Sequence, residues 1–200
     1  MTARFILSGI LLTMIMTGCT SPRVTRMPVE KTVDFSGRWN DTDSRLVAEE
    51  MIQDCLARPW INTFNEKTHR DPIVIVGTVV NRSHEHIDSQ LFTKDLEKNV
   101  LNSGKVKFIA SRQERPDLRE ERDQQRAGST DPETIKHQAR ETGADFMVQG
   151  TINSVKDEIK GKYAILYQVN LELVDLTTNQ KVWIGQKEIK KVVGKSKYSL

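Results

Sequence analysis

Apolar residues recur at the three- and four-residue spacing of an α-helix in two segments of the chain. The first pattern follows four residues of N-cap type at positions 40–43 and stops at Pro59, which predicts a helix between them. Its apolar stripe consists of Leu46, Val47, Met51, Ile52, Cys55 and Leu56. The second pattern predicts a helix over residues 89–102, with Asp88 as its N-cap and Gly104 closing it. The apolar face of this helix consists of Phe92, Leu96 and Val100.

Two runs of β-branched and apolar residues flank the second helix. Residues 73–80 form a near-continuous apolar run, typical of a strand buried on both faces. Residues 106–110 predict a second, shorter strand. Because a strand, a helix and a strand of this length make a crossover unit, we expect the two strands to be parallel and connected right-handedly.

The C-terminal part of the chain alternates apolar and polar residues, as strands with one buried face do. Strands are predicted over residues 144–159, 162–176 and 181–192, and the sequence TTNQ predicts a hairpin turn between the last two. In the middle strand the apolar positions are Tyr163, Ile165, Tyr167, Val169, Leu171 and Leu173. The predicted fold class is therefore α+β: a small mixed sheet, with a parallel crossover pair and antiparallel hairpin strands, flanked by helices.

A polar segment separates these two parts of the chain. Residues 111–130 are almost wholly polar and charged, which indicates either a solvated helix or loop, or a flap that faces a partner. Asp131 and Pro132 then predict the start of a further helix that Gly143 ends.

The N-terminal residues predict a secretory signal over residues 1–18. Arg4 precedes an apolar run of about 12 residues, shorter than the ~20 that a membrane-spanning helix needs. The residues MTGC resemble a bacterial lipobox, which implies cleavage before Cys19, lipidation of Cys19 and sorting to the outer membrane. We expect residues 19–33 to comprise the lipidated cysteine and a flexible tether, since the segment after Cys19 contains two prolines and no apolar periodicity. Residues 34–200 are then expected to form one globular periplasmic domain. An ordinary secretory signal is the alternative.

Charge and cysteine content exclude several classes. The formal net charge is +3, and removal of Arg4 with the signal leaves +2, so the composition gives no reason to expect nucleic-acid binding. Cys55 is the one cysteine left besides Cys19, so no disulfide joins two unmodified cysteines. Its place on the apolar stripe indicates a small buried hydrophobe. The lysines of the C-terminal strand and tail, which could meet an acidic partner or protect a sheet edge, are Lys187, Lys190, Lys191, Lys195 and Lys197.

Catalytic and metal signals are weak. His84 and His86 lie one residue apart in a polar loop, without a third ligand at a recognisable spacing. The sequence contains neither a nucleophile elbow nor a glycine-rich phosphate loop, and we expect no enzyme activity, metal or cofactor.

Five segments, in this order, resemble the LpoB-type outer-membrane lipoproteins: FSGRWNDTDSRLVAEEMI, VGTVVNRSHEHID, LNSGKVKFI, ETGADFMVQGTI and YQVNLELVDLTTNQKVW. The resemblance implies a non-catalytic activator that binds a class A penicillin-binding protein and stimulates peptidoglycan synthesis. It also implies a fold similar to the amino-terminal domain of TolB. One departure is the tether of 14 residues between Cys19 and residue 34, which spans at most ~50 Å, whereas the best-known members have a long one.

Exposed polar loops are the expected docking surface, because recognition residues concentrate on loops held by a rigid scaffold. The predicted contact residues are Arg82, His84, Glu85, His86, Arg112, Glu114 and Arg115. The alternative for these loops is that they only solubilise the ends of the sheet. The alternative for the protein is a periplasmic accessory subunit of an outer-membrane secretion or assembly complex of the curli-secretion type.

Overall fold

The computed structural model describes residues 25–28, 31–131, 133–135 and 141–194, and the chain from Thr32 onward forms one unit, described here by itself. Along the chain its helices and strands are α1 (Asp41–Leu56), α2 (Trp60–Thr68), β1 (Ile73–Asn81), α3 (Ser89–Asn102), β2 (Lys107–Phe108), α4 (Arg115–Gln124), the π-helical turn η1 (Gln125–Ser129), β3 (Phe146–Ile159), β4 (Lys162–Asp175) and β5 (Lys181–Gly194).

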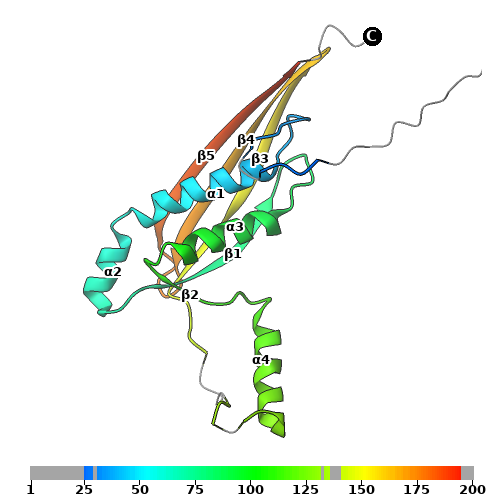
Figure 1. Ribbon diagram of the computed structural model, residues 1–200. Helices are drawn as coiled ribbons and strands as arrows, with labels where there is room; N and C mark the ends of the chain where they lie inside the picture. The colour runs from blue at the N-terminus through cyan, green and yellow to red at the C-terminus, as the bar shows by residue number, and fades with distance from the viewer. Residues whose placement is uncertain (1–24, 29–30, 132, 136–140, 195–200) are drawn as a thin grey trace, which may run out of the picture. The chain divides into compact units, whose positions relative to one another are not determined.

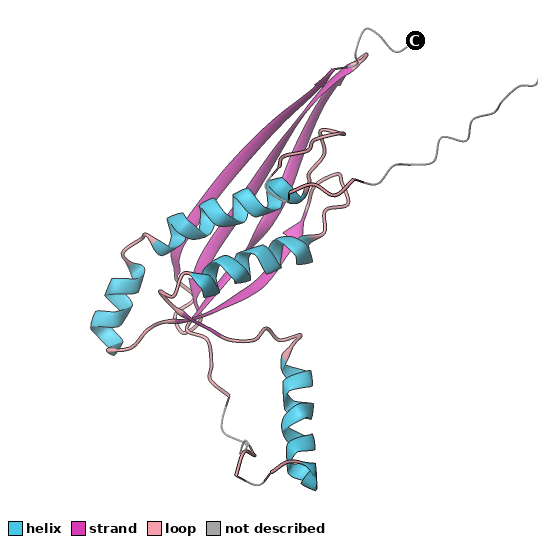
Figure 2. Cartoon of the chain, in the orientation of Figure 1, coloured by secondary structure: helices cyan, strands magenta, loops and turns pink. Residues whose placement is uncertain are grey.

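The five strands form one mixed sheet in the order β2-β1-β3-β4-β5 (Figure 1). β1 is parallel to both β2 and β3, whereas β3, β4 and β5 follow one another in antiparallel pairs. Helices α1 and α3 lie along one face of this sheet (Figure 2). The mixed α+β class and the parallel β1–β2 pair are thus confirmed.

Local capping explains where the helices begin and end. The Asn40 side chain accepts from the backbone N–H of Asp43, while the Asp43 carboxylate accepts from the backbone N–H of Asn40, so both helix-start donors are satisfied. Asp88 caps α3 in the predicted way, and Gly104 follows it with a φ of 65°, a conformation that glycine adopts without strain. Both helices are confirmed.

The core lies between these helices and the sheet. On β4 every second residue from Ile165 to Leu173 is buried, and α3 contributes Phe92 and Leu96 to the same layer. Trp39 packs edge-on against Phe92 and Tyr167, with ring centroids 6.2 Å and 5.5 Å from its own. These contacts fasten residues 32–40, named here the arm, to the domain. Cys55 is buried in this core, and burial raises the pKa of its thiol to about 12.

Some elements differ from their prediction. β2 has two residues where five were predicted, and β1 is fully buried only over its first four residues, because Thr78 and Val80 are exposed. α2 was not predicted, and Trp60 and Ile61 bury its first turn. The polar segment after β2 contains the solvated helix α4, none of whose residues is buried. A helix predicted from residue 132 to 142 falls largely outside the described residues, and the described 133–135 and 141–142 are not helical.

Two lysines of the edge strand β5 face α1 and the arm. Lys191 Nζ lies 2.6 Å from the Asp43 carboxylate and 2.8 Å from that of Asp34, and Lys187 pairs with Glu50. Burial lowers the pKa of Lys191, but the hydrogen bonds to these two aspartates outweigh it and raise the pKa overall. These two side chains therefore join β5 to the arm and α1. Lys195 and Lys197 lie outside the described residues.

Candidate functional site

The loop of residues 82–87, which follows β1, carries four of the predicted contact residues. Arg82, His84 and His86 are exposed, Glu85 between them is half-buried, and Ile87 is buried. Alternation along the loop therefore sends the side chains of Arg82 and the two histidines outward. Glu85 and the buried Ile87 attach the loop to the domain.

Hydrogen bonds from Asn81 fix the loop's backbone. The Asn81 side-chain oxygen accepts from the backbone N–H of Ser83 at 2.9 Å, and its amide nitrogen donates to the carbonyl of Glu85 at 2.8 Å. The backbone N–H of His84 donates to the hydroxyl of Ser154 on β3 at 3.1 Å. Because the loop's own polar groups are used in this way, it presents its outward side chains from a defined backbone.

Glu85 joins the loop to β4 and to the arm. The Tyr167 hydroxyl donates to Glu85 Oε2 at 2.8 Å and accepts from the backbone N–H of Trp39 at 3.0 Å. Burial, together with the adjacent carboxylate, raises the pKa of Tyr167 far above its ordinary value. Tyr167 therefore stays a neutral donor, and Glu85 serves to position the loop.

A cavity of about 390 Å³ lies beside this loop. Its lining comes from the arm, the loop, β3 and β4, and consists of Arg38, His84, Glu85, His86, Ser154, Lys156, Tyr163 and Ile165. The sequence prediction missed Arg38, Lys156 and Tyr163, which come from three separate segments. To find these three residues from the sequence, one would need to predict that β3 pairs with β4 and that the arm packs against both strands.

The second predicted contact segment lies elsewhere. Arg112 is exposed and lines a different cavity, of about 440 Å³, between β1, α3 and residues 111–113. β2 pairs only with Ile73 and Val74, at the start of β1. The 82–87 loop begins at the other end of β1, about 20 Å along the strand from this pairing. The structure thus does not bring the two segments into one site.

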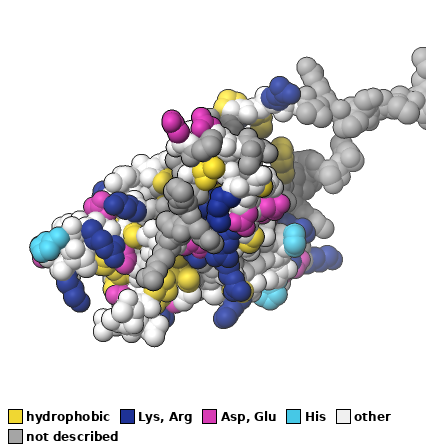
Figure 3. Space-filling view, turned by 90° about the horizontal axis from the view of Figure 1, so that it is seen from below, with side chains coloured by type: hydrophobic (Ala, Val, Ile, Leu, Met, Phe, Trp, Pro, Cys, Tyr) yellow, Lys and Arg dark blue, Asp and Glu magenta, His cyan; other side chains and the backbone are white. Residues whose placement is uncertain are grey.

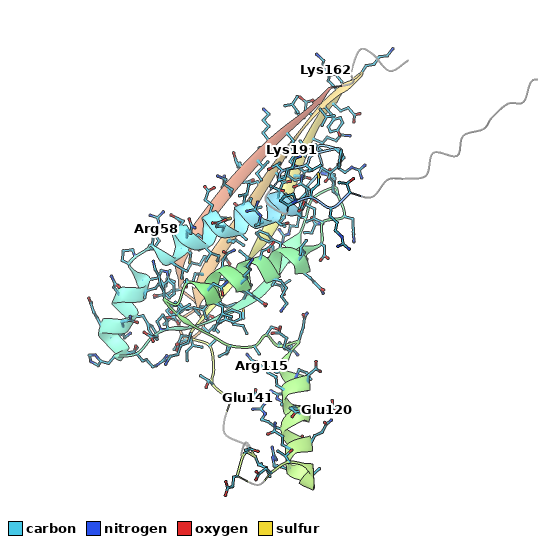
Figure 4. The ribbon with its side chains drawn as sticks, viewed as in Figure 1. Arg58, Arg115, Glu120, Glu141, Lys162 and Lys191 are labelled. Carbon is cyan, nitrogen blue, oxygen red and sulfur yellow. The ribbon has the colours of Figure 1, made fainter. Side chains whose placement is uncertain are left out.

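Glu114 and Arg115 make contacts within the domain. Glu114 accepts from Lys94 Nζ at 2.6 Å and from the backbone N–H of Ser111 at 2.8 Å, which ties the start of α4 to α3. The hydrogen bond from Lys94 is the main reason that the pKa of Glu114 falls to about 2. Arg115 Nε donates to the carbonyl of Ala110. Farther along, the Glu141 carboxylate joins Arg119 and Arg122 of α4, near the labelled Glu120 (Figure 4).

Replacing Glu114 with glutamine is expected to lower the free energy of unfolding by about 0.5 kcal/mol at neutral pH, since the pair with Lys94 is solvent-screened. The folded-state pKa lies below the ordinary value of 4.5, so this stabilisation is present above pH 4.5 and is lost as the pH falls toward 2. Urea unfolding of both proteins across this range measures the difference. A difference that grows on acidification would contradict the assignment.

Among the residues that the structure describes, no group of three or more His, Cys, Asp and Glu side chains could hold a metal ion. No helix in the described ranges is long and apolar enough to cross a membrane. Figure 3 shows Lys and Arg side chains interspersed with acidic and hydrophobic ones on the face seen from below. The fold and the site together define an α+β domain in which hydrogen bonds fix the backbone of the 82–87 loop and the side chains of Arg82, His84 and His86 are exposed.

The chain belongs to the family of the peptidoglycan-synthase activator LpoB, whose model matches residues 43–189. Similar solved structures include the LpoB C-terminal domain from Escherichia coli, at 14% identity and a TM-score of 0.44, covering 76% of this chain and 99% of that one. Lipoprotein GNA1162 from Neisseria meningitidis is similar at 15% identity and a TM-score of 0.38, covering 62% and 86%. Among curated proteins, no sequence matches the chain.

Proposed function

We propose that this protein binds and activates a class A penicillin-binding protein, and that it has no catalytic activity of its own. Membership of the peptidoglycan-synthase activator family is the observation that carries the proposal. The ordered 82–87 loop supports it, because a rigid loop with exposed polar side chains suits recognition of a protein partner.

We further propose that Cys19 is lipidated and anchors the protein in the outer membrane, with the domain facing the periplasm. The lipobox-like sequence before Cys19 supports this anchor. Several acyl chains on one cysteine hold a protein stably at a membrane, whereas a single chain gives marginal binding. Mass spectrometry of the mature N-terminus is expected to find acylated Cys19, and an unmodified cysteine would refute the anchor.

Within the predicted contact set, the exposed side chains have the docking role. Arg82, His84 and His86 project from the first loop, and Arg112 projects from the second segment. Glu85, Glu114 and Arg115 contribute indirectly, because they position the segments that carry the others.

The direct test is glycan-strand synthesis from lipid II by each class A penicillin-binding protein of the same cell, with and without the residue 33–200 fragment. We expect a marked increase in rate with one synthase. If a folded fragment stimulates none of them, the proposal fails. A ring-shaped homo-oligomer without synthase binding would instead favour an accessory subunit of a secretion or assembly complex.

Replacing Arg82, His84 and His86 together with alanine is expected to weaken synthase binding about tenfold, because these side chains supply the polar contacts of the loop. The free energy of unfolding should change little, since all three are exposed. Surface plasmon resonance and urea unfolding measure the two quantities.

The matched control replaces Lys67 and Lys107, which are also exposed, with alanine. These residues lie on α2 and β2, away from the 82–87 loop. We expect this control to bind as the unmodified protein does. Equal weakening by both sets of substitutions would show a general charge effect and remove the loop from the docking surface.

A further inference from the structure

We propose that one end of the sheet rests on an anionic phospholipid surface. This end, named here the distal end, comprises residues 155–166 of β3, β4 and their turn, together with residues 190–194 of β5. The inference goes beyond synthase activation and rests on the proposed anchor at Cys19 only for the identity of the membrane. Its first support is an exposed apolar patch.

The apolar patch lies on the face of the sheet opposite α1 and α3. Val155 pairs with Leu166, and Ala164 pairs with Val192, so the patch crosses three strands. Val155, Ile159 and Val192 are 66%, 69% and 73% exposed. Asp157 lies on the same face between Val155 and Ile159, so one carboxylate interrupts the patch. Exposed apolar side chains gathered on one face mark a surface that contacts another body.

Both helices stop short of this end. In Figure 1 the strands β3, β4 and β5 continue past α1 and α3, and the last five residues of β3 are all exposed. The patch lies on the other face of the sheet, so neither helix covers it and Val155, Ile159 and Val192 stay largely exposed. An external apolar phase would bury these side chains.

Lysines surround the patch. Lys160, Lys162 and Lys190 are exposed, and Figure 4 shows Lys162 at the tip of the β3–β4 hairpin. Lys156 forms an ion pair with Glu158, which leaves Asp157 as the one unpaired acid among residues 155–162. Exposed apolar side chains bordered by lysines are typical of a segment that lies in the interface of an anionic bilayer.

The arm joins the domain at the same end. The Tyr163 hydroxyl donates to the carbonyl of Ser36 at 2.5 Å, and Lys191 pairs with Asp34 at 2.8 Å. Tyr163 and Lys191 both belong to the distal end, so the arm is attached there. Residues 20–33 of the tether span at most ~50 Å, so an anchor at Cys19 keeps the distal end within reach of the bilayer.

A second copy of this chain fits the patch less well than lipid does. A two-fold symmetric contact would bring the lysines of one copy near those of the other, because each copy presents the same surface. Like charges facing one another oppose association. Anionic head groups meet these lysines with the opposite charge.

The test is co-sedimentation of the chain with lipid vesicles. The protein carries Cys19→Ser and is produced without residues 1–18, so no acyl chain contributes. We expect binding to vesicles of phosphatidylethanolamine and phosphatidylglycerol that weakens with added salt, and little binding to phosphatidylcholine. Failure to bind the anionic vesicles, or equal binding to both kinds, would overturn the proposal, as would a concentration-dependent dimer that covers the patch.

Val192→Asp is expected to reduce vesicle binding about fivefold or more, since it removes an apolar contact and adds a negative charge. Its matched control is Ile184→Asp on the same open face of β5, where Ile184 is 65% exposed but lies outside the distal end. A second variant, Lys160→Glu with Lys162→Glu, tests the same surface at the turn. Unchanged binding by folded distal variants, or an equal loss in Ile184→Asp, would overturn the proposal.

The vesicle result and the synthase result are separable. Val192→Asp lies outside the 82–87 loop and is expected to stimulate the synthase in solution as the unmodified protein does. Vesicle binding without synthase stimulation would support the lipid contact and contradict the activator function. Synthase stimulation without vesicle binding would support the activator function and contradict the lipid contact.

Discussion

Replacing Gly150 with alanine is expected to lower the free energy of unfolding by about 3 kcal/mol, at the upper end of the usual cost of overpacking. A Cβ at this position would lie 2.0 Å from the backbone carbonyl oxygen of Asn170 and 2.7 Å from a methyl carbon of Leu171. The clash is with backbone of the neighbouring strand, so a change of rotamer cannot relieve it. β3 would have to shift against β4.

Urea unfolding of Gly150→Ala measures the effect, and Gly194→Ala is its matched control. Gly194 is also a strand glycine, the last residue of β5, but a Cβ there meets no atom within 4 Å. We expect the control to stay within about 0.5 kcal/mol of the unmodified protein. A loss below about 1 kcal/mol for Gly150→Ala would mean that the two strands separate more easily than their close approach implies.

The second large effect is expected for Tyr167→Phe, at about 2 kcal/mol. This substitution removes one hydroxyl, so the Trp39 backbone N–H loses its acceptor at 3.0 Å and the half-buried Glu85 carboxylate loses its donor at 2.8 Å. Only the longer direct bond of 3.4 Å between these two groups is left. The aromatic ring stays, so its packing against Trp39 is kept. Because Glu85 positions the 82–87 loop, synthase stimulation should fall together with stability.

Tyr163→Phe is the matched control for Tyr167→Phe. Tyr163 lies on the same strand and face, and its hydroxyl also bonds to the arm, but it is only half-buried. Water can replace that bond, so we expect a loss of about 0.5 kcal/mol. Thermal unfolding and the synthesis assay measure both variants. Equal losses would mean that burial of Glu85 and Tyr167 adds nothing.

Elements with local signals could be predicted from the sequence. α1 and α3 carry their own caps and apolar stripes, and β4 carries its alternation, so no distant residue is needed to place them. The length of β2 could not be predicted, because the pattern of residues 106–110 does not reveal that only two of them pair with β1. After these two residues the chain leaves the sheet, so the two predicted contact segments line different cavities.

The roles of single charged residues were also beyond the sequence. Glu85 and His84 are neighbours in a polar loop, yet one faces Tyr167, 82 positions away, and the other faces solvent. Lys190 and Lys191 are adjacent in a basic run, but the two-residue period of β5 exposes the first and places the second between two aspartates. Such pairings depend on strand register, which the hydrophobic pattern alone does not give for polar positions.

Burial of Cys55 has a practical consequence. Cys55 is 2% exposed and the pKa of its thiol is raised to about 12, so almost none of the thiol is thiolate at neutral pH and a maleimide cannot reach it in the native protein. The sequence holds only one other cysteine, Cys19. Alkylation of the native protein therefore distinguishes two forms of the mature chain. A free thiol at Cys19 takes one label, whereas a Cys19 whose sulfur carries a diacylglycerol takes none.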